Sequence, residues 1–516
     1  MIAAESRDLR RWLASGAQAV KRARVRLDAI NVFPVPDADT GTNMYLTLQE
    51  GNRAVAKLPQ AASHREVVAA FARGALLGAR GNSGVIVSQY LSAFLRDIDK
   101  SGGLSEAKPA AIAAALQSAT DAAYAAVGAP VEGTMLSVAQ AASHGAAEAA
   151  ASKAGRNEVI RAAVVAARAA LRATLEELPA AKSAGVVDAG AAGLVLQLEM
   201  LAETFGGAEA LAGIDYVEWE LASTGEGVVA VPVHHEYASV GGAYEVMFVA
   251  QLDDRGAARG SALRELTAAL SALGDSVAVT EAHGLVNAHV HTDEPDGAVE
   301  VGIATKARQI LVSSLVVGHP REGASERDRA VTGIVALTSC PGLAAPLADA
   351  GAMVLVVPDP ALLKRRALRR AVSDASGRGV VIAPGNAQLR AAAEDLARHR
   401  TGVGITVLPC GHEAQVIAAV AAGALVTPGE PLEAVMRAAV ERCAVTSSSP
   451  DALDDDVDRL LTADTEIVTI VLARGVPLSV VDSVKISAAT VCRSADVNVY
   501  QGGHGSPGVL VGVERP

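Results

Sequence analysis

Hydrophobic residues recur at helical spacing through the first part of the chain. Ala and Leu return every three or four positions, which is the period of one buried helix face. Gly or Pro interrupts the pattern between the segments 66–78, 108–127, 134–154 and 157–177. Few runs of β-branched residues occur before residue 205. We therefore predict an all-helical domain over residues 1–205.

The pattern changes from about residue 226. Short Val-rich segments bounded by turn residues are typical of strands, and they lie at Gly227–Val233, Tyr244–Leu252, Ser276–Thr280 and Val286–His291. A helical segment is expected over 260–273. These elements predict a small α/β domain over residues 226–320, and the turn-rich stretch 319–327 predicts a linker.

Beyond residue 328, strand-like segments alternate with helical ones. The expected strands are Gly333–Ser339, Met353–Val357, Val380–Ala383 and Gly404–Leu408, and the expected helices are 342–350, 360–377, 386–398 and 413–422. This alternation predicts a parallel sheet with crossover helices. Further strands are expected at 466–473, 497–501 and 507–513, around a helix at 481–491. The chain is thus predicted to be multidomain, with a C-terminal α/β domain over 328–516.

The composition narrows the class of protein. Half of the 516 residues are hydrophobic and only 3% are aromatic, which favours Ala-rich helices and Val-rich strands. The net charge of −12 argues against a nucleic-acid binder, which needs a basic footprint. Four cysteines without CxxC spacing fit a reduced compartment. The first residues lack the apolar core of a signal peptide, and no apolar run could span a membrane. We expect a cytoplasmic protein without a transmembrane segment.

The segment Asn31–Met44 carries the most informative chemistry. Pro34 and Pro36 disfavour a helix and stiffen an extended approach. Asp37 and Asp39, separated by one small residue, can face the same cation, and a helix is expected directly afterwards. Magnesium takes one or two protein carboxylates together with phosphate oxygens, and a helix N-terminus adds N–H groups for the phosphate. Taken alone, the pattern also fits a common acidic turn with a threonine cap.

Three further segments are rich in small residues. They are Gly78–Gly84, Glu132–Met135 and Ser183–Gly193. Glycines let a backbone approach phosphate closely, and Ser83 can donate a hydrogen bond. Taken alone, Gly78–Gly84 is more often an ordinary helix–helix turn, Glu132–Met135 is a capped helix start, and Ser183–Gly193 favours close helix packing. The sequence contains neither a P-loop motif nor the protein-kinase motifs.

Together, in this order, the four segments resemble the nucleotide-binding domain of the dihydroxyacetone kinase L-subunit type, and more narrowly the catalytic subunit of bacterial fatty acid kinase. The family's N-V-F-P-V-P-D-G-D-T-G-T-N-M is matched over 31–44 with Ala38 in place of Gly. Its A-R-G-N-S-G and P-V-E-G-T are intact at 79–84 and 130–134, and G-V-V-D-A-G-G-A-G is matched at 185–193 with Ala191 for Gly. If position 38 requires a positive φ, Ala there is strained by roughly 1 kcal/mol; otherwise the change is harmless.

The resemblance implies a helical barrel that holds ATP or ADP, with two Mg²⁺ ions, at one end. Asp37 and Asp39 would ligate magnesium, with Asn31 as a neighbour. Met44 and Met135 would line the base and sugar region. The residues implied to contact phosphates are Thr42, Asn43, Ser83, Gly84 and Thr134.

A second candidate metal site lies in the middle domain. His289 and His291 are two apart on a predicted strand, so both imidazoles face one side and could bind one metal. In the resembling fatty acid kinase subunit, this H-V-H joins a cysteine to hold zinc, and Glu245 stands at that cysteine's position here. His234 and His235 are alternative third ligands. A carboxylate makes the site harder and weaker for soft metals. Without the resemblance, H-x-H is more often packing or surface; a zinc ion here would be structural.

The resemblance further implies an activity and a partner. The chain would transfer the γ-phosphoryl group of ATP to a fatty acid presented by a separate fatty-acid-binding carrier protein, giving acyl phosphate. The C-terminal region would dock the carrier, by analogy alone. Two alternatives stay open: a kinase for dihydroxyacetone or a similar small substrate, and a non-catalytic nucleotide-binding regulator. A homodimer is neither required nor excluded by the sequence.

Overall fold

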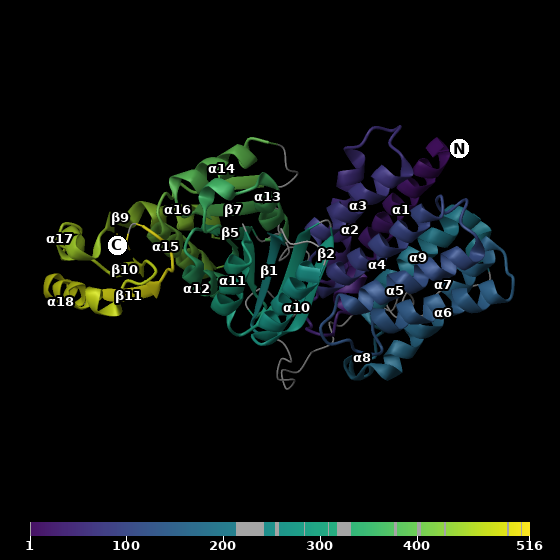
Figure 1. Cartoon of the computed structure of the whole chain (residues 1–516). Helices are drawn as coiled ribbons and strands as arrows, with labels where there is room; N and C mark the ends of the chain where they lie inside the picture. Colours follow the sequence, from purple (N-terminus) through teal and green to yellow (C-terminus); the bar gives the residue numbers. More distant parts are fainter. Residues whose placement is uncertain are drawn as a thin grey trace. The chain divides into compact units, whose positions relative to one another are not determined.

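The computed structural model describes eleven stretches of the chain (Figure 1). They are residues 2–212, 242–252, 257–282, 284–307, 309–316, 332–375, 379–399, 404–427, 430–492, 495–506 and 508–516. The expected strand Gly227–Val233, the candidate ligands His234 and His235, and the whole of the expected linker 319–327 lie outside the described residues.

The N-terminal region is helical, as its periodicity predicts. Its helices, coloured purple to blue in Figure 1, are α1 (Ile2–Ala29), α2 (Thr40–Ala56), α3 (His64–Gly78), α4 (Gly81–Lys100), α5 (Pro109–Ala125), α6 (Met135–Ala151), α7 (Arg156–Glu177), the short α8 (Pro179–Ala184) and α9 (Ala189–Gly206). The four helices expected over 66–78, 108–127, 134–154 and 157–177 are confirmed.

Local chemistry fixes several helix starts in this region. Ser63 accepts a hydrogen bond from Glu66 N, and the Glu66 carboxylate accepts one from Ser63 N, which forms a capping box before α3. Pro109 occupies the first turn of α5, where no N–H partner is needed. The helix boundaries therefore follow from residues that satisfy the exposed N–H groups of each first turn.

The helices pack around one apolar core. Most helices pack against the next one along the chain, and α9 packs back onto both α1 and α7. Small Ala residues line much of the core, and Trp12, Phe71 and Phe94 fill its wider parts. This arrangement confirms an all-helical N-terminal region; its closure into a barrel stays a prediction.

The strands of the middle region and the next region lie in one sheet. In the described residues its order is β2-β3-β1-β4-β6-β5-β7-β8. The strands are β1 (Tyr244–Gln251), β2 (Gly274–Ala282), β3 (Leu285–Thr292), β4 (Ile310–Ser314), β5 (Gly333–Thr338), β6 (Met353–Val356), β7 (Gly379–Pro384) and β8 (Gly404–Val407). Strand β4 pairs antiparallel with both β1 and β6. Strands β6, β5, β7 and β8 are parallel, as predicted.

Helices accompany these strands. They are α10 (Ala257–Ser271), α11 (Pro295–Ala304), α12 (Ala344–Asp349), α13 (Arg365–Asp374), α14 (Ala387–Ala397), α15 (Glu413–Ala424) and α16 (Leu432–Arg442). The strand–helix alternation expected after residue 328 is therefore confirmed.

The end of the chain forms a second sheet, with the order β11-β10-β12-β9 in the described residues. Its elements are β9 (Cys443–Ser448), α17 (Leu453–Asp458), β10 (Ile467–Leu472), α18 (Asp482–Val491), β11 (Asp496–Gln501) and β12 (Val509–Glu514). The expected terminal strands around a helix are confirmed.

By its internal contacts the chain divides into two compact units, residues 1–241 with 252–290, and residues 242–251 with 291–516. Within the first unit, the helices contact β2 and β3. Asn287 Nδ2 donates to Leu76 O at 3.1 Å, and Val127 forms an isolated bridge with Ala278. Among the described residues, every helix is too short or too polar to cross a bilayer. The domain limits 1–205, 226–320 and 328–516 stay predictions.

Candidate functional site

Four helix N-termini meet at one end of the helical region, and each carries one of the four segments singled out in the sequence. A Cβ at Gly81, at the start of α4, would lie 2.6 Å from Asn43 Nδ2 on α2. A Cβ at Gly193 on α9 would overlap the Met44 thioether. A Cβ at Gly190 would lie 3.0 Å from Met135 Cε on α6. The starts of α4, α2, α9 and α6 are thus linked in that order.

The acidic loop between α1 and α2 is organised by Asn31. Its buried side-chain amide donates to the Asp37 carboxylate, and its oxygen accepts a hydrogen bond from the Thr40 hydroxyl at 2.9 Å. Asp37 and Asp39 are both half-buried. Ala38 between them has a φ of 54°. This positive φ is the conformation in which an alanine at position 38 is strained. The loop therefore presents two carboxylates from a fixed backbone.

Sequence reasoning missed a third carboxylate behind this loop. Asp28, in the last turn of α1, accepts hydrogen bonds from Thr42 N at 2.9 Å and from Thr42 Oγ1 at 2.8 Å. Burial raises the pKa of Asp28, while the hydrogen bonds from Thr42 and the charge of Arg24 act to lower it. The Thr42 hydroxyl thus points to a carboxylate in this structure. The only sequence signal was the proximity of Asp28 to the loop.

The four helix starts differ in their caps. At α6, Thr134 Oγ1 accepts from Leu136 N at 3.3 Å and donates to Val131 O at 2.7 Å. At α9, the Asp188 carboxylate accepts from Ala191 N at 2.7 Å and also from Met135 N. Burial outweighs these hydrogen bonds and raises the pKa of Asp188 to about 6. The N-termini of α6 and α9 are therefore already satisfied by side chains.

The N-termini of α2 and α4 differ from each other. Asp39 and Arg80 occupy the two N-cap positions, and neither side chain makes a cap hydrogen bond. At α2 the Asp28 carboxylate instead accepts hydrogen bonds from the backbone N–H groups of Gly41 and Thr42. Within the described residues, the buried Asn82 Oδ1 in the first turn of α4 has no hydrogen-bond partner. The uncapped first turn of α4 and the positive end of its dipole favour an anion there.

The remaining predicted residues lie around these helix starts. Ser83 is half-buried in the first turn of α4, and Gly84 packs against Thr47. Met44 and Met135 are 0% and 3% exposed and belong to the apolar core. Their assignment to a base and sugar region, and the assigned phosphate contacts, stay predictions.

This donor set fits a magnesium nucleotide in its chemistry. Carboxylate oxygens are the ligands that Mg²⁺ prefers, and phosphate oxygens usually complete its shell. The uncapped end of α4 suits a phosphate. Asp37, Asp39 and the start of α4 are the residues that would hold such a ligand.

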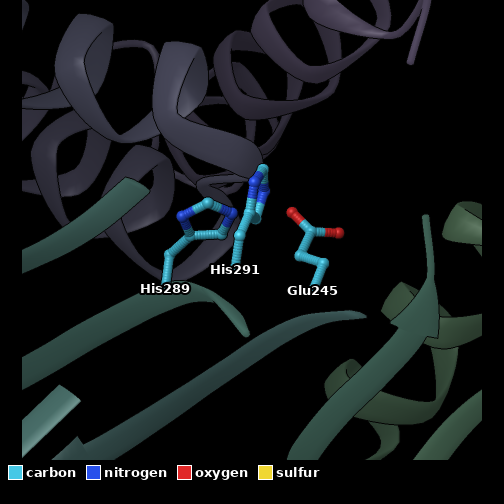
Figure 2. Close-up of side chains that lie close together, drawn as sticks. All are labelled: Glu245, His289 and His291. Carbon is cyan, nitrogen blue, oxygen red and sulfur yellow. The ribbon is translucent and has the colours of Figure 1, made fainter. Parts of the chain in front are cut away.

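The second candidate site is built on β1 and β3. The ligand atoms of Glu245, His289 and His291 all lie within 4.8 Å of one another. Figure 2 shows the two imidazoles side by side and the Glu245 carboxylate beside them. Both histidines are buried, at 1% and 5% exposure, and β1 is the sheet neighbour of β3. The structure therefore brings together the three residues that the sequence proposed as a metal site.

A hydrogen bond orients one of these imidazoles. His289 Nδ1 lies 3.1 Å from the carbonyl oxygen of Ser276, so Nδ1 carries the proton and Nε2 the lone pair. Metal-binding histidines are commonly held by such a second bond. Two imidazoles and one carboxylate are ligands that zinc accepts.

Comparison with known protein families gives two matches. Residues 34–203 match the model of the DAK2 domain. Residues 241–314 match the model of the middle domain of proteins like the A component of fatty acid kinase. The first match contains the acidic loop and the starts of all four site helices. The second contains Glu245, His289 and His291.

Relatives and solved structures add context. Protein YloV of Bacillus subtilis (strain 168) is 33% identical over 299 residues, which are 56% of this chain and 52% of YloV. An uncharacterized protein of Staphylococcus haemolyticus (strain JCSC1435) is 33% identical over 293 residues, 56% of this chain and 51% of that protein. The chain thus spans about half the length of these relatives.

Among solved structures, the dihydroxyacetone kinase of C. freundii in complex with AMP-PNP and Mg²⁺ is 21% identical over 37% of this chain and 33% of its own. Its TM-score of 0.29 is too low to support a structural argument.

The chain is thus similar to the DAK2 domain over residues 34–203 and to the fatty acid kinase middle domain over residues 241–314.

Proposed function

We propose that this chain is an ATP-dependent kinase subunit that phosphorylates a fatty acid presented by a separate carrier protein. The observation that carries the proposal is the acidic loop with Asp37 and Asp39, set directly before α2 and beside the uncapped start of α4. The match of residues 241–314 to a fatty acid kinase middle domain favours a fatty acid over other acceptors.

In this proposal the residues of the site act mainly by positioning and by balancing charge, which is what phosphoryl transfer requires of a protein. Bound Mg²⁺ would neutralise charge on the phosphate oxygens. Asp37 and Asp39 would hold it, and Asn31 would keep Asp37 in place through its amide. The N–H groups at the start of α4 would orient the phosphate chain. Asp28 would hold Thr42, and with it the first turn of α2.

A fatty acid requires no general base from the site. Its carboxylate is ionised at neutral pH, so the attacking oxygen has no proton to lose. The product would be an acyl phosphate and ADP. A small hydroxylated acceptor such as dihydroxyacetone would instead require deprotonation, and this remains the second candidate function.

The partner follows from the acceptor. A long apolar chain requires a protein that shields it from water, so we propose a fatty-acid-binding carrier in the cytoplasm, with the C-terminal region as its docking platform. A non-catalytic regulator would bind nucleotide without turning it over.

The test is acyl phosphate formation by the purified chain with Mg-ATP and a fatty-acid-loaded carrier, trapped with hydroxylamine. Asp37→Asn and Asp39→Asn should each lower the rate at least a hundredfold. Glu148→Gln, at an exposed acid in the last turn of α6, should leave the rate unchanged and controls for loss of a carboxylate. ATP turnover with dihydroxyacetone but not with any loaded carrier would contradict the proposal.

We further propose that Glu245, His289 and His291 hold one structural zinc ion. What supports this is the distance among their ligand atoms and the match of the segment to the middle-domain family.

A further inference from the structure

A cationic face covers the last two turns of α1. Lys21, Arg22 and Arg26 are exposed, and Arg24 is half-buried. These four residues are called the cationic face below. At 100° per residue they lie within about 200° of the helix circumference. Between Asp8 and Asp28 the chain has no acidic residue, although its net charge is −12. The face is therefore positively charged on a molecule whose net charge is negative.

The cationic face is not explained by ion pairing. In the part of the chain that the structure describes, none of its four residues forms a salt bridge. Lys21 lies over the Tyr45 ring at 5.9 Å from its centre, which holds the ammonium group beside α2. Arg26 also complements the C-terminal end of the α1 dipole, but that role does not require Lys21, Arg22 or Arg24.

The face borders the candidate nucleotide site. A Cβ at Gly41, in the first turn of α2, would lie 2.6 Å from Arg24 O, so this turn of α1 packs directly against the start of α2. The charge of Arg24 acts on Asp28, which accepts two hydrogen bonds from Thr42. The cationic face and the acidic loop therefore border the same helix start.

We propose that the cationic face steers the polyphosphate of a nucleotide toward this site. A molecule with excess negative charge, and with carboxylates in the site itself, repels an anionic ligand at a distance. Cations placed within about one Debye length, roughly 8 Å at physiological salt, reverse that repulsion locally. Such fields raise association rate constants by tenfold or more, and salt weakens them.

A nucleotide suits this face better than a macromolecular partner does. Interface cores need contiguous apolar or aromatic area, whereas the exposed apolar residue among these cations is Val25, at 49% exposure. Exposed charges with little apolar area between them act over distance rather than through burial. The inference rests on the proposed nucleotide binding and adds how the nucleotide arrives.

The test is stopped-flow binding of a fluorescent ADP analogue with Mg²⁺ to the full chain. Arg22→Glu with Arg26→Glu should lower the association rate constant at least fivefold at about 20 mM salt, leave the dissociation rate constant unchanged, and lose most of this difference at about 0.5 M salt. Arg22→Gln with Arg26→Gln should give an intermediate effect.

Lys57→Glu with Arg65→Glu is the matched control, because it makes the same charge change near the far end of α2. That helix has 17 residues, so the two ends are about 25 Å apart. Equal association rate constants in wild type and the Arg22/Arg26 variant, or an equal loss in the control, would overturn the steering role. The steering role would also be overturned if the Arg22/Arg26 variant changed only the dissociation rate constant. It would be overturned as well if this variant lost binding to anionic phosphatidylglycerol vesicles while its nucleotide association rate constant stayed the same. If wild type gives no saturable signal, the proposed function fails as well.

Discussion

Ala38 holds a backbone conformation that suits glycine. Its φ of 54° costs an L-residue about 1–2 kcal/mol, whereas glycine loses roughly 0.5–1 kcal/mol more conformational entropy on folding than alanine. The first effect is larger, so Ala38→Gly should stabilise the helical region by about 0.5 kcal/mol. Ala38→Val should destabilise it, because a β-branched side chain fits this region less well. Guanidinium unfolding curves measure both; an Ala38→Gly protein less stable than wild type would refute the strain.

The Asp28–Thr42 pair gives a second prediction at the scale of single residues. If the Thr42 hydroxyl works by bonding Asp28, Thr42→Val and Asp28→Asn should each weaken Mg-ADP binding about tenfold, and the double variant should be little weaker than either single one. Such non-additivity is expected for two residues that share one interaction. Fully additive losses would instead favour a direct contact between the Thr42 hydroxyl and phosphate, as the family resemblance implies.

At the scale of elements, one carboxylate joins two helix starts. Asp188 caps α9 and also accepts Met135 N of α6. Burial raises its pKa from 3.8 to about 6, so between those pH values the folded protein keeps a proton that the unfolded chain releases. The free energy of unfolding should therefore fall by about 3 kcal/mol as pH rises from about 4 to about 6, and stay level above that.

Asp188→Asn should remove this dependence, because the amide does not titrate and its oxygen can still accept an N–H bond. The measurement is hydrogen exchange in peptides from α6 and α9 across this pH range, corrected for intrinsic rates. Parallel pH profiles in the two proteins would show that Asp188 titrates normally.

The pairing of β1 with β3 brings Glu245 to the two histidines, and this predicts a metal-dependent stability. The chain should bind about one equivalent of zinc, melt at a higher temperature with zinc than after chelation, and lose both properties in His291→Ala. Glu245→Cys should bind zinc at least tenfold more tightly, since thiolate is the softer ligand. His399→Gln, at an exposed position, is the control. Absence of zinc by elemental analysis after incubation would refute the site.

At the scale of the whole molecule, local patterns predicted the elements well. The helices expected at 66–78 and 157–177 begin and end within about two residues of α3 and α7, because helical periodicity and caps are properties of neighbouring residues. The parallel order of β5, β7 and β8 also followed from strand–helix alternation.

Contacts between distant segments were harder to predict. The antiparallel pairing of β4 with β6, which joins the strands of two expected domains in one sheet, depends on residues that no local pattern connects. The bond from Thr42 to Asp28 and the double role of Asp188 likewise depend on how helices pack. Glu245 was identified as a partner of His289 and His291 only through the family resemblance, because spacing along the chain does not reveal which strands become neighbours.

A calorimetric titration of the full chain with ADP tests most directly whether nucleotide binds with magnesium at the acidic loop. We predict one saturable binding event in the presence of Mg²⁺, loss of that heat with excess chelator, and at least tenfold weaker binding in Asp37→Asn and Asp39→Asn but not in Glu148→Gln. Absence of saturable heat in wild type, or equal affinity in the two loop variants, would contradict the account.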